Sequence, residues 1–388
     1  MKNPSAYLKL LILSCFLSTI WSALSAQKKF IHPGILHTQE SLNRINKIAQ
    51  DKIMPGYGSF ELLKAHPCAS ADYMMKGPFS TISRDGEFRD TKSKMESDFS
   101  AAYLNALMWV ATKDARHAAK SLQILVAYAD TLKHIPSTND APLLVGLEGT
   151  KIVNAIEILR YTYGGVSKAQ LQQITAMVTG IFLPICDTFY STPAYTNGNW
   201  GPIVTKFYMS AAIFLDNEAM YKKAVDFYYN ANDNGTIKNY VSGTTGQIQE
   251  SGRDQGHSML GIGALATVCE IAYNQGDDLY SAYDNRLLKG FEYVAKYNLG
   301  EDVPFETWTD VTGKYSSWTK ISEIGRGRFM PVFEMAYNHY VLLNNLSMPY
   351  TEKVLQHTRP EGYDRDQPAF GTLLFYGSGK GKPQPGKK

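Results

Sequence analysis

Side chains that can transfer a proton or pair with a charge stand together directly before an apolar stretch in the second half of the chain. They are Glu250, Arg253, Asp254, Gln255 and His257, within the segment GQIQESGRDQGHSMLGIG at 246–263. Glu250, Arg253 and His257 are spaced i, i+3 and i+7, so they share one face if the turn is already helical. The next segment, MLGIGALATVCEIAY, is apolar almost all round, so we expect the polar cluster at its start to be enclosed as well.

Two interpretations of this cluster are open from the residues alone. In a structural interpretation, Arg253 and His257 neutralise Glu250 and Asp254 in an ion-paired helix entry, since buried charges do occur as paired networks. In a functional interpretation, the enclosed titratable groups carry out acid–base chemistry. A metal site of Glu250, Asp254 and His257 is a third option, which is weak because it contains one histidine. We therefore predict a catalytic cluster that holds no metal and needs no other cofactor.

A second polar group lies in the turn TNGNW, from Thr196 to Trp200. Asn197 is expected either to cap a helix or hold the turn, as asparagine often does, or to contact a substrate. Asn199 beside Trp200 points more directly to a ligand, because an amide donor next to an indole face suits a sugar that carries a carboxylate. The turn is therefore a candidate sugar-binding site.

A third candidate is the segment from Phe305 to Glu334, which lacks regular periodicity and contains Tyr315, Trp318, Arg326 and Arg328. Long irregular loops in compact domains are uncommon and usually functional. The GRGR sequence at 325–328 either forms a glycine-spaced turn at a helix start or brings two arginines near a tyrosine. In the second case the cations would lower the pKa of the tyrosine by favouring the phenolate.

The elements that must position these residues are helices. Between Asp98 and Tyr340 apolar residues recur at helical spacing, and strand alternation is scarce. The pattern predicts roughly nine or ten helices joined by short connectors, which must pack as antiparallel neighbours. Because no fixed-period repeat is present, a solenoid is disfavoured. We predict an all-α fold, an α/α toroid or incomplete α/α barrel of antiparallel helical hairpins, with loops near 140, near 200 and at 303–331 forming the site at one rim.

Both ends of the chain differ from the body. Residues 1–26 have two lysines, an apolar run from Leu10 to Trp21 and small residues up to Ala26, which predicts a cleavable signal peptide and a periplasmic or secreted protein. A membrane anchor is less favoured because the run is shorter than the roughly 20 residues that a span needs. A lipid anchor at Cys15 is a further alternative. No later segment is expected to span a membrane. Residues 27–376 are predicted to form one domain, followed by a disordered basic tail at 377–388.

Charge and cysteine content exclude several classes of protein. The net charge is +3 for the whole chain, and much of the positive charge lies in the two ends. The body therefore has no basic field, which disfavours nucleic-acid binding. Beyond the predicted signal peptide the cysteines are Cys68, Cys186 and Cys269, an odd number at wide spacing that fits neither a disulfide framework nor a zinc motif. No oligomeric state is predicted.

Six motifs occur in order along the chain: HPGILHTQESLNRI at 32–45, NGNW at 197, QESGRDQGH at 249, FEYVAKYNLGEDVPF at 291, GRGRF at 325 and FGTLLF at 370. Together they resemble the alginate-lyase-like polysaccharide lyases of gut and marine Bacteroidetes. They cover nearly the whole chain after the predicted signal peptide. The resemblance implies an α/α-toroid fold and cleavage of a uronic-acid polymer by β-elimination.

β-Elimination explains why such residues would be gathered. The proton α to a uronate carboxylate leaves only if the carboxylate charge is neutralised and the developing enolate is stabilised, which asparagine, glutamine, histidine, arginine or a protonated glutamate can do. Glu250, Gln255, His257 and Asn199 are of the right types. A base then takes the C5 proton and an acid protonates the departing O4.

Tyr315 is the predicted acid and base, with Arg326 or Arg328 as the cation beside it. Tyr195, Tyr293 and Tyr297 are the next candidates. Where the proton and the leaving oxygen lie on the same side of the ring, one tyrosine can serve both steps; otherwise a histidine and a tyrosine divide them. His257 is therefore either base or neutraliser. The predicted substrate-binding residues are Asn197, Trp200, Arg253, Gln255, Trp318 and Arg328.

The sequence thus predicts an exported lyase that acts on an acidic polysaccharide, foremost alginate rich in mannuronate and next glucuronan. Two other classes are weighed against it. One is an α/α-barrel glycoside hydrolase with paired carboxylates drawn from Glu250, Asp254, Asp310 and Glu323. The other is a glycan-binding helical protein without activity. The clustered titratable residues favour catalysis.

Overall fold

The computed structural model describes residues 28–377, so the predicted signal peptide and nearly all of the predicted basic tail lie outside the described residues. Contacts divide the chain after Phe30, and every helix described below belongs to the part that begins at Ile31. In residues 28–377 the only β structure is three isolated bridges, such as the one between Gly34 and Thr38. The all-α prediction is confirmed.

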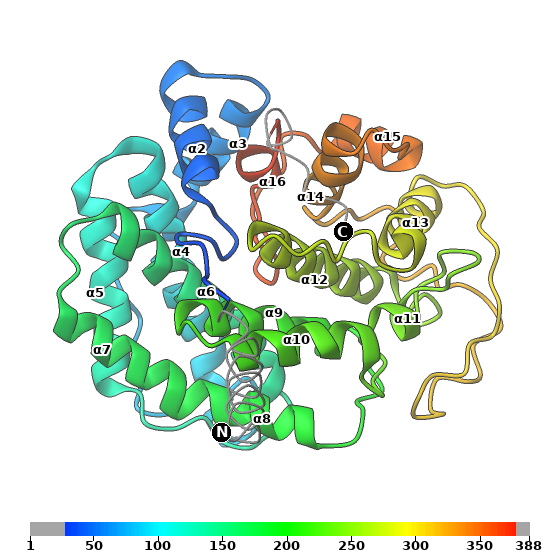
Figure 1. Cartoon of the computed structure of the whole chain (residues 1–388), viewed down its shortest axis with the longest axis horizontal. Helices are drawn as coiled ribbons and strands as arrows, with labels where there is room; N and C mark the ends of the chain where they lie inside the picture. The colour runs from blue at the N-terminus through cyan, green and yellow to red at the C-terminus, as the bar shows by residue number, and fades with distance from the viewer. Residues whose placement is uncertain (1–27, 378–388) are drawn as a thin grey trace, which may run out of the picture. The chain divides into compact units, whose positions relative to one another are not determined.

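An inner layer of helices forms a closed ring. Each member contacts the next along the chain, and α16 contacts α2, which closes the circle. The colours in Figure 1 show this closure, since the red α16 lies near the blue α2 and α3. The members are α2 (Gln39–Asp51), α4 (Lys92–Thr112), α6 (Ala141–Thr162), α9 (Trp200–Phe214), α12 (Gln255–Asn274), α14 (Phe333–Tyr337) and α16 (Gly371–Leu374).

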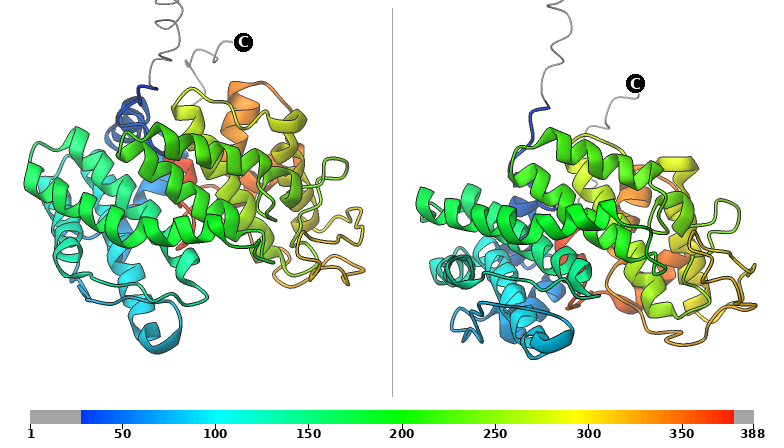
Figure 2. Two further views of the ribbon diagram at one scale, coloured as in Figure 1. Left: turned by 60° about the horizontal axis from the view of Figure 1, so that its bottom comes forward. Right: turned by 90° about the horizontal axis from the view of Figure 1, so that it is seen from below.

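A second layer covers this ring, so the architecture is an α/α toroid as predicted. Helix α3 packs on α2, α5 on α4, α8 on α6, α10 on α9, α13 on α12 and α15 on α14; Figure 2 shows the two layers from other sides. The outer helices are α3 (Gly56–Ala65), α5 (Ala115–Thr131), α7 (Lys168–Met177), α8 (Leu183–Ser191), α10 (Glu218–Asn230), α13 (Ala282–Asn298) and α15 (Pro349–Thr358).

Short helical pieces complete the described chain. They are the 3₁₀ turns η2 (Pro67–Ala69) and η3 (Gly86–Thr91), the π-helical turns η4 (Val178–Phe182) and η5 (Asn338–Leu343), and α11 (Ile237–Tyr240). The described residues therefore contain more helices than the predicted nine or ten. Pieces of four or five residues make little more than one turn, which is too short to show a periodic apolar pattern.

Burial explains the division into layers. All residues of α9 are buried, and α12 is buried along almost its whole length, as expected for a helix that is apolar all round. In α5 the buried residues instead recur on one stripe, from His117 through Ser121 and Leu125 to Tyr128. The inner helices α9 and α12 are therefore enclosed by neighbours, whereas the outer helix α5 faces solvent along part of its surface.

One outer segment corrects a prediction about membranes. The continuous helical stretch Lys168–Ser191, made of α7, η4 and α8, is long and apolar enough to cross a bilayer by length and composition. The expectation that no segment after residue 26 has the length and apolar composition of a membrane span is therefore wrong. In the structure α7 packs on α5, and α8 packs on α6, so this stretch forms part of the outer layer of the toroid.

The HPGILH motif ties the start of the toroid to its middle. His32 Nδ1 lies 2.7 Å from Glu157 Oε1 on α6, and its Nε2 lies 3.1 Å from Asp216 Oδ1 after α9. His37 contacts Tyr103 of α4 at 2.7 Å, and Thr38 caps α2 by accepting a hydrogen bond from the Ser41 amide. The motif is therefore a structural one that joins three inner helices.

Candidate active site

The N-terminal turns of three inner helices meet at one rim of the toroid. Leu147 of α6, Ile203 of α9 and Leu260 of α12 pack together within the first two turns of their helices, and Leu143 and Met330 pack on them. The loops that enter these helices therefore converge, as predicted for the regions near 140 and 200. The loop that follows α13 reaches the same rim, because Met330 belongs to it.

Glu250 is the centre of the polar cluster at this rim. Its side chain is fully buried and accepts hydrogen bonds from Arg253 Nη1 at 2.8 Å, from the backbone amide of Asn199 at 3.1 Å and from Tyr240 Oη at 3.1 Å. Burial raises the pKa of Glu250, and the positive charge of Arg253 offsets part of this rise. The ion-paired helix entry expected in the structural interpretation is thus present.

Asp254 and His257 begin α12. One oxygen of Asp254 caps the helix by accepting a hydrogen bond from the His257 amide at 2.7 Å, and the other lies 2.6 Å from His257 Nδ1. Burial raises the pKa of Asp254, but the hydrogen bonds from His257 outweigh it and the net shift is downward. The side chain of His257 is 38% exposed. Its Nε2 edge is therefore held in a defined orientation and remains accessible to a ligand.

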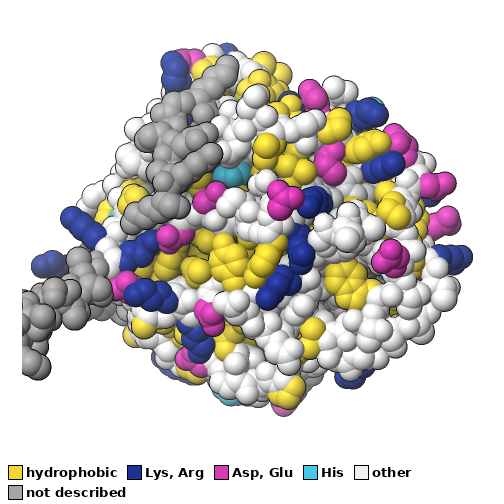
Figure 3. Space-filling view, turned by 45° about the vertical axis from the view of Figure 1, so that its right-hand side comes forward, with side chains coloured by type: hydrophobic (Ala, Val, Ile, Leu, Met, Phe, Trp, Pro, Cys, Tyr) yellow, Lys and Arg dark blue, Asp and Glu magenta, His cyan; other side chains and the backbone are white. Residues whose placement is uncertain are grey.

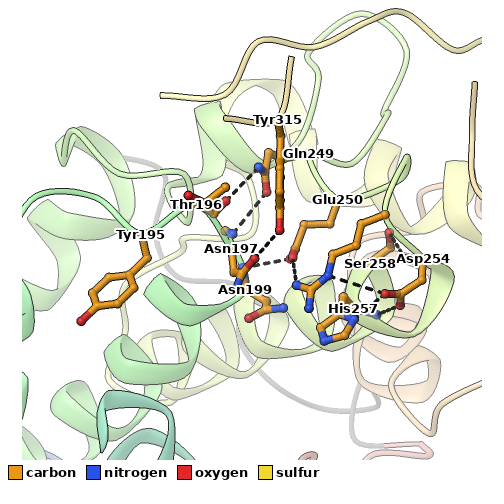
Figure 4. A network of polar contacts seen from close by, with 12 residues as sticks. Tyr195, Thr196, Asn197, Asn199, Gln249, Glu250, Asp254, His257, Ser258 and Tyr315 are labelled. Atoms are coloured by element: carbon orange, nitrogen blue, oxygen red, sulfur yellow. Dashed lines mark hydrogen bonds and ion pairs between the residues drawn. The ribbon is translucent and has the colours of Figure 1, made fainter. Parts of the chain in front are cut away.

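Asn199 offers a free amide in this setting. It occupies the N-cap position of α9 but makes no side-chain capping bond, and it is only 1% exposed. Neither its Oδ1 nor its Nδ2 has a hydrogen-bond partner within residues 28–377. A buried polar group without a partner is costly unless a ligand or water completes it. Figure 4 shows Asn199 next to Glu250 in the cluster.

Tyr315 reaches the cluster from the long loop after α13. Its Oη donates a hydrogen bond to Asn197 Oδ1 at 2.5 Å, and its ring packs on Trp318 with centroids 4.2 Å apart. Burial raises the pKa of Tyr315, and Arg253 is the cation that partly opposes this rise. The structure therefore joins Tyr315, Asn197, Asn199, Glu250 and His257, which lie far apart in the sequence.

Arg326 and Arg328 are not the partners of Tyr315, contrary to the sequence prediction. Arg326 donates to the Tyr297 carbonyl at 2.9 Å, and its guanidinium lies 4.0 Å from the centroid of the Tyr297 ring. Arg328 is exposed. The prediction that nearby arginines of GRGR lower the pKa of Tyr315 is wrong, because the chain folds Arg326 back against α13.

The alternative tyrosines are held in other contacts. Tyr293 is buried and donates to the Pro304 carbonyl at 2.8 Å, while Tyr297 is buried beneath Arg326. Tyr195 stacks between Phe189 and Trp200, with ring centroids at 5.2 and 4.7 Å. Among the tyrosines singled out from the sequence, Tyr315 is the one hydrogen-bonded into the Asn197 turn.

Gln255 and Trp200 have structural surroundings. Gln255 is buried, donates to the Ser322 carbonyl at 2.9 Å and accepts from Asn298 Nδ2 at 3.1 Å, so its amide is used in fastening the long loop to α12. Trp200 is also buried, under Tyr195. Neither side chain is presented to the rim as an open substrate contact. Trp318 is half-buried and accessible there.

The carboxylates do not form the pair that a glycoside hydrolase would need. Asp310 is turned into the loop, where it accepts bonds from Asn234, Thr312 and the Tyr315 amide. Glu323 is exposed on the loop surface. Glu250 and Asp254 are both engaged by Arg253. Within residues 28–377 no three His, Cys, Asp or Glu side chains gather in a way that could hold a metal ion.

Two contributors were missed from the sequence. Tyr240 donates to Glu250 and to the His257 carbonyl at 3.0 Å, which ties the acidic residue to the start of α12. Gln249 accepts from the Gly198 amide at 3.2 Å and donates to the Thr196 carbonyl at 3.1 Å, which holds the Asn197 turn. The glycine at position 261 is the sequence feature that indicates the first contact, because any side chain there would clash with the Tyr240 hydroxyl.

The face shown in Figure 3 carries charges of both signs, with aspartate and glutamate side chains spread over it and several lysine and arginine side chains gathered near its middle. At the candidate site the cation is a specific side chain, because Arg253 is paired with Glu250 and is the positive charge that acts on Tyr315.

Comparison with known proteins agrees with this architecture. The chain is similar in fold to alginate lyase A1-III from Sphingomonas species A1, with a TM-score of 0.63 at 11% identity over 86% of this chain and 94% of that one. It is also similar to an alginate lyase from Bacteroides ovatus, with a TM-score of 0.55 at 13% identity over 89% of this chain and 99% of that one. At these identities the similarity shows a shared fold.

Two further neighbours are variants of alginate lyase A1-III complexed with tetrasaccharide. A histidine-to-alanine variant has a TM-score of 0.62 at 11% identity over 89% of this chain and 94% of that one. A tyrosine-to-phenylalanine variant has a TM-score of 0.59 at 13% identity over 88% of this chain and 94% of that one.

A search of the curated proteins gave no match. The family profile described as alginate lyase matches residues 60–305, well over half of the chain. The chain therefore belongs to the alginate lyase family and is a polysaccharide lyase.

Proposed function

We propose that this lyase cleaves a uronate polymer by β-elimination at the Tyr315–Asn199–His257 cluster, with mannuronate-rich alginate as its substrate. The observation that carries the proposal is that the cluster contains a buried Asn199 side-chain amide without a partner and, hydrogen-bonded to Asn197 in the same turn, the Tyr315 hydroxyl. One group is suited to binding a carboxylate and the other to moving a proton.

Neutralisation of the uronate carboxylate falls to donors around Glu250. The accessible edge of His257 binds the carboxylate directly, and the buried Asn199 Nδ2 donates to it through a bridging water. Arg253 supplies positive charge and is oriented by Glu250 at 2.8 Å. The starts of α9 and α12 add the partial positive charge of helix N-termini. With its carboxylate charge offset, the sugar can lose the C5 proton and pass through an enolate.

Tyr315 then makes both proton transfers, in which one proton passes from C5 to O4. As the phenolate, its Oη takes the C5 proton; the C4–O4 bond breaks, a C4=C5 double bond forms, and the same hydroxyl returns the proton to O4. Asn197 Oδ1 accepts a hydrogen bond from the protonated hydroxyl at 2.5 Å, so this contact positions Tyr315 before it loses its proton and after it has taken up the C5 proton. One residue can serve both steps only where the proton and O4 lie on the same face, which is the case for mannuronate and glucuronate and not for guluronate.

Further support comes from the neighbouring structures. The solved alginate lyase A1-III complexes with tetrasaccharide are of a histidine and a tyrosine variant. The same two residue types, His257 and Tyr315, belong to the present cluster.

Export to the periplasm or the medium is part of the proposal and rests on the composition of residues 1–26. N-terminal sequencing of the exported protein tests it, with the mature chain expected to begin near Gln27.

A polymer panel tests the function. The purified protein is incubated with polymannuronate, polyguluronate, glucuronan and polygalacturonate, and the ultraviolet absorbance of the unsaturated product is followed. We expect product from polymannuronate, less from glucuronan and none from the other two. No increase in absorbance with any of the four polymers would contradict the lyase mechanism. New reducing ends without absorbance would indicate hydrolysis, and polymer binding without either product would indicate a glycan-binding protein.

A further inference from the structure

The loop that carries Tyr315 lies at the surface and has a single buried residue. Between Glu301 and Pro331 all residues are exposed or half-buried except Asp310, which is 4% exposed. A loop of this kind has few apolar contacts to hold it, so hydrogen bonds must decide where its side chains lie. The anchor nearest to Tyr315 along the chain is therefore the environment of Asp310.

Asp310 organises the loop around Tyr315. One of its oxygens accepts from the Tyr315 amide at 2.9 Å, and the other accepts from the Thr312 amide at 3.1 Å and from Thr312 Oγ1 at 2.7 Å. These bonds close the turn from 310 to 315. The turn by itself does not determine where Tyr315 lies relative to the rest of the site.

Asn234 connects this turn to the loop that carries Asn197. The side chain is fully buried; its Nδ2 donates to Asp310 Oδ2 at 2.7 Å and to the Tyr195 carbonyl at 2.8 Å, and its Oδ1 accepts from the Val311 amide at 2.8 Å. A second link joins Thr196 Oγ1 and Thr312 Oγ1 at 3.2 Å. One amide side chain thus holds both segments whose tips meet in the Tyr315–Asn197 hydrogen bond.

We propose that Asn234, acting through Asp310, is a positioning residue that sets the Tyr315 hydroxyl against Asn197 for proton transfer. The inference rests on the proposed role of Tyr315. Asn234 itself is buried behind the two loops and contacts no substrate. Displacing a reacting group by about 1 Å can cost on the order of 100-fold in rate, so a positioning residue of this kind has a measurable effect.

The test compares Asn234→Ala with Asn232→Ala in the full-length enzyme. Asn232 is an exposed asparagine two positions earlier, so it controls for the loss of an amide in this segment. Hydrogen exchange is followed by mass spectrometry for peptides covering 308–317 and for α12, and kcat and KM are measured on the polymer that the enzyme cleaves. Asp310→Asn receives the same measurements and serves as the milder variant if Asn234→Ala fails to fold.

In Asn234→Ala we expect the Val311 and Tyr315 amides to exchange at least about tenfold faster, with α12 unchanged. We expect kcat to fall by about 10-fold or more while KM changes by less than about threefold, because binding groups are untouched and only the reacting group is misplaced. Asn232→Ala should match the unmodified enzyme in all three measurements.

Two results would overturn the inference. Unchanged exchange at 308–317 in Asn234→Ala would mean that this side chain does not hold the loop. Faster exchange with unchanged kcat would mean that the loop needs no such holding for catalysis. Failure of the unmodified enzyme to eliminate any polymer counts against the proposed function instead, and the exchange measurement distinguishes the two because it needs no substrate.

Discussion

At the scale of single residues, the Tyr315 hydroxyl is the group on which the proposed elimination depends. Tyr315→Phe should abolish elimination and preserve polymer binding, since the ring and its packing on Trp318 remain. Turnover and polymer affinity are measured side by side, with the exposed Tyr283→Phe as the matched control. If Tyr315→Phe keeps more than about a tenth of the turnover, a loss under about 1.4 kcal/mol, the hydroxyl is neither acid nor base.

The pH dependence of the same reaction follows from the direction of the Tyr315 shift. Because burial raises the pKa of Tyr315, the hydroxyl is protonated in the resting enzyme at neutral pH, and the phenolate fraction increases as the pH rises. The rate at low substrate concentration should therefore increase from neutral into alkaline pH. A maximum below neutrality would assign the base to another group.

Glu250 gives a second prediction at this scale. Its carboxylate accepts three hydrogen bonds, from Arg253, Tyr240 and the backbone amide of Asn199. In Glu250→Gln the new NH₂ group would face one of these three donors, and that hydrogen bond would be lost. We expect turnover to fall by about tenfold or more with the fold intact by circular dichroism. Full activity in this variant would instead support a neutral, hydrogen-bond-donating Glu250.

At the scale of elements, the N-cap residue of α12, Asp254, combines a structural and a chemical role. Asp254 caps the helix through one oxygen and orients His257 through the other. Asp254→Asn should keep the cap but remove the charge beside His257, whereas Asp254→Ala should also lose about 1 kcal/mol of stability. Thermal unfolding and turnover are measured for both variants. Wild-type turnover in Asp254→Asn would show that His257 needs no carboxylate partner.

At the scale of the whole molecule, the segment before α2 is tied to the middle of the ring through His32. His32 is paired with Glu157 and Asp216, and the hydrogen bond to Glu157 is the main cause of a raised pKa for His32. A histidine whose pKa is raised on folding stabilises the protein below its unfolded pKa of about 6.5, and this contribution is lost as the pH rises through the folded value.

His32→Gln should therefore lower the melting temperature more at about pH 5.5 than at about pH 9. The exposed His357→Gln on α15 is the matched control and should show little effect at either pH. An equal loss for His32→Gln at both values would mean that the His32 side chain contributes through packing on Tyr161, at a centroid distance of 5.1 Å, rather than through its charge.

The sequence alone determined the class of fold. Apolar spacing marks helices such as α5 and α6 because the pattern depends on 3.6 residues per turn, which is a local property of the chain. The absence of a fixed repeat favoured a toroid over a solenoid, and the short connectors predicted antiparallel neighbours. Closure of the ring through α16 and α2 is beyond such reasoning, because a four-residue helix leaves almost no periodic signal.

The sequence also marked Asn199, Glu250, His257 and Tyr315, since their residue types suit the chemistry of a uronate. Only the tertiary structure decided which groups surround them: Arg253 rather than Arg326 acts on Tyr315, and Gln255 turns inward. Tyr240 joins the site at Glu250, and Asn234 supports the Tyr315 loop from behind. The physical reason is distance along the chain. Asn234 and Asp310 are 76 positions apart, and a bond between such residues depends on how the ring closes and how an exposed loop folds back on it.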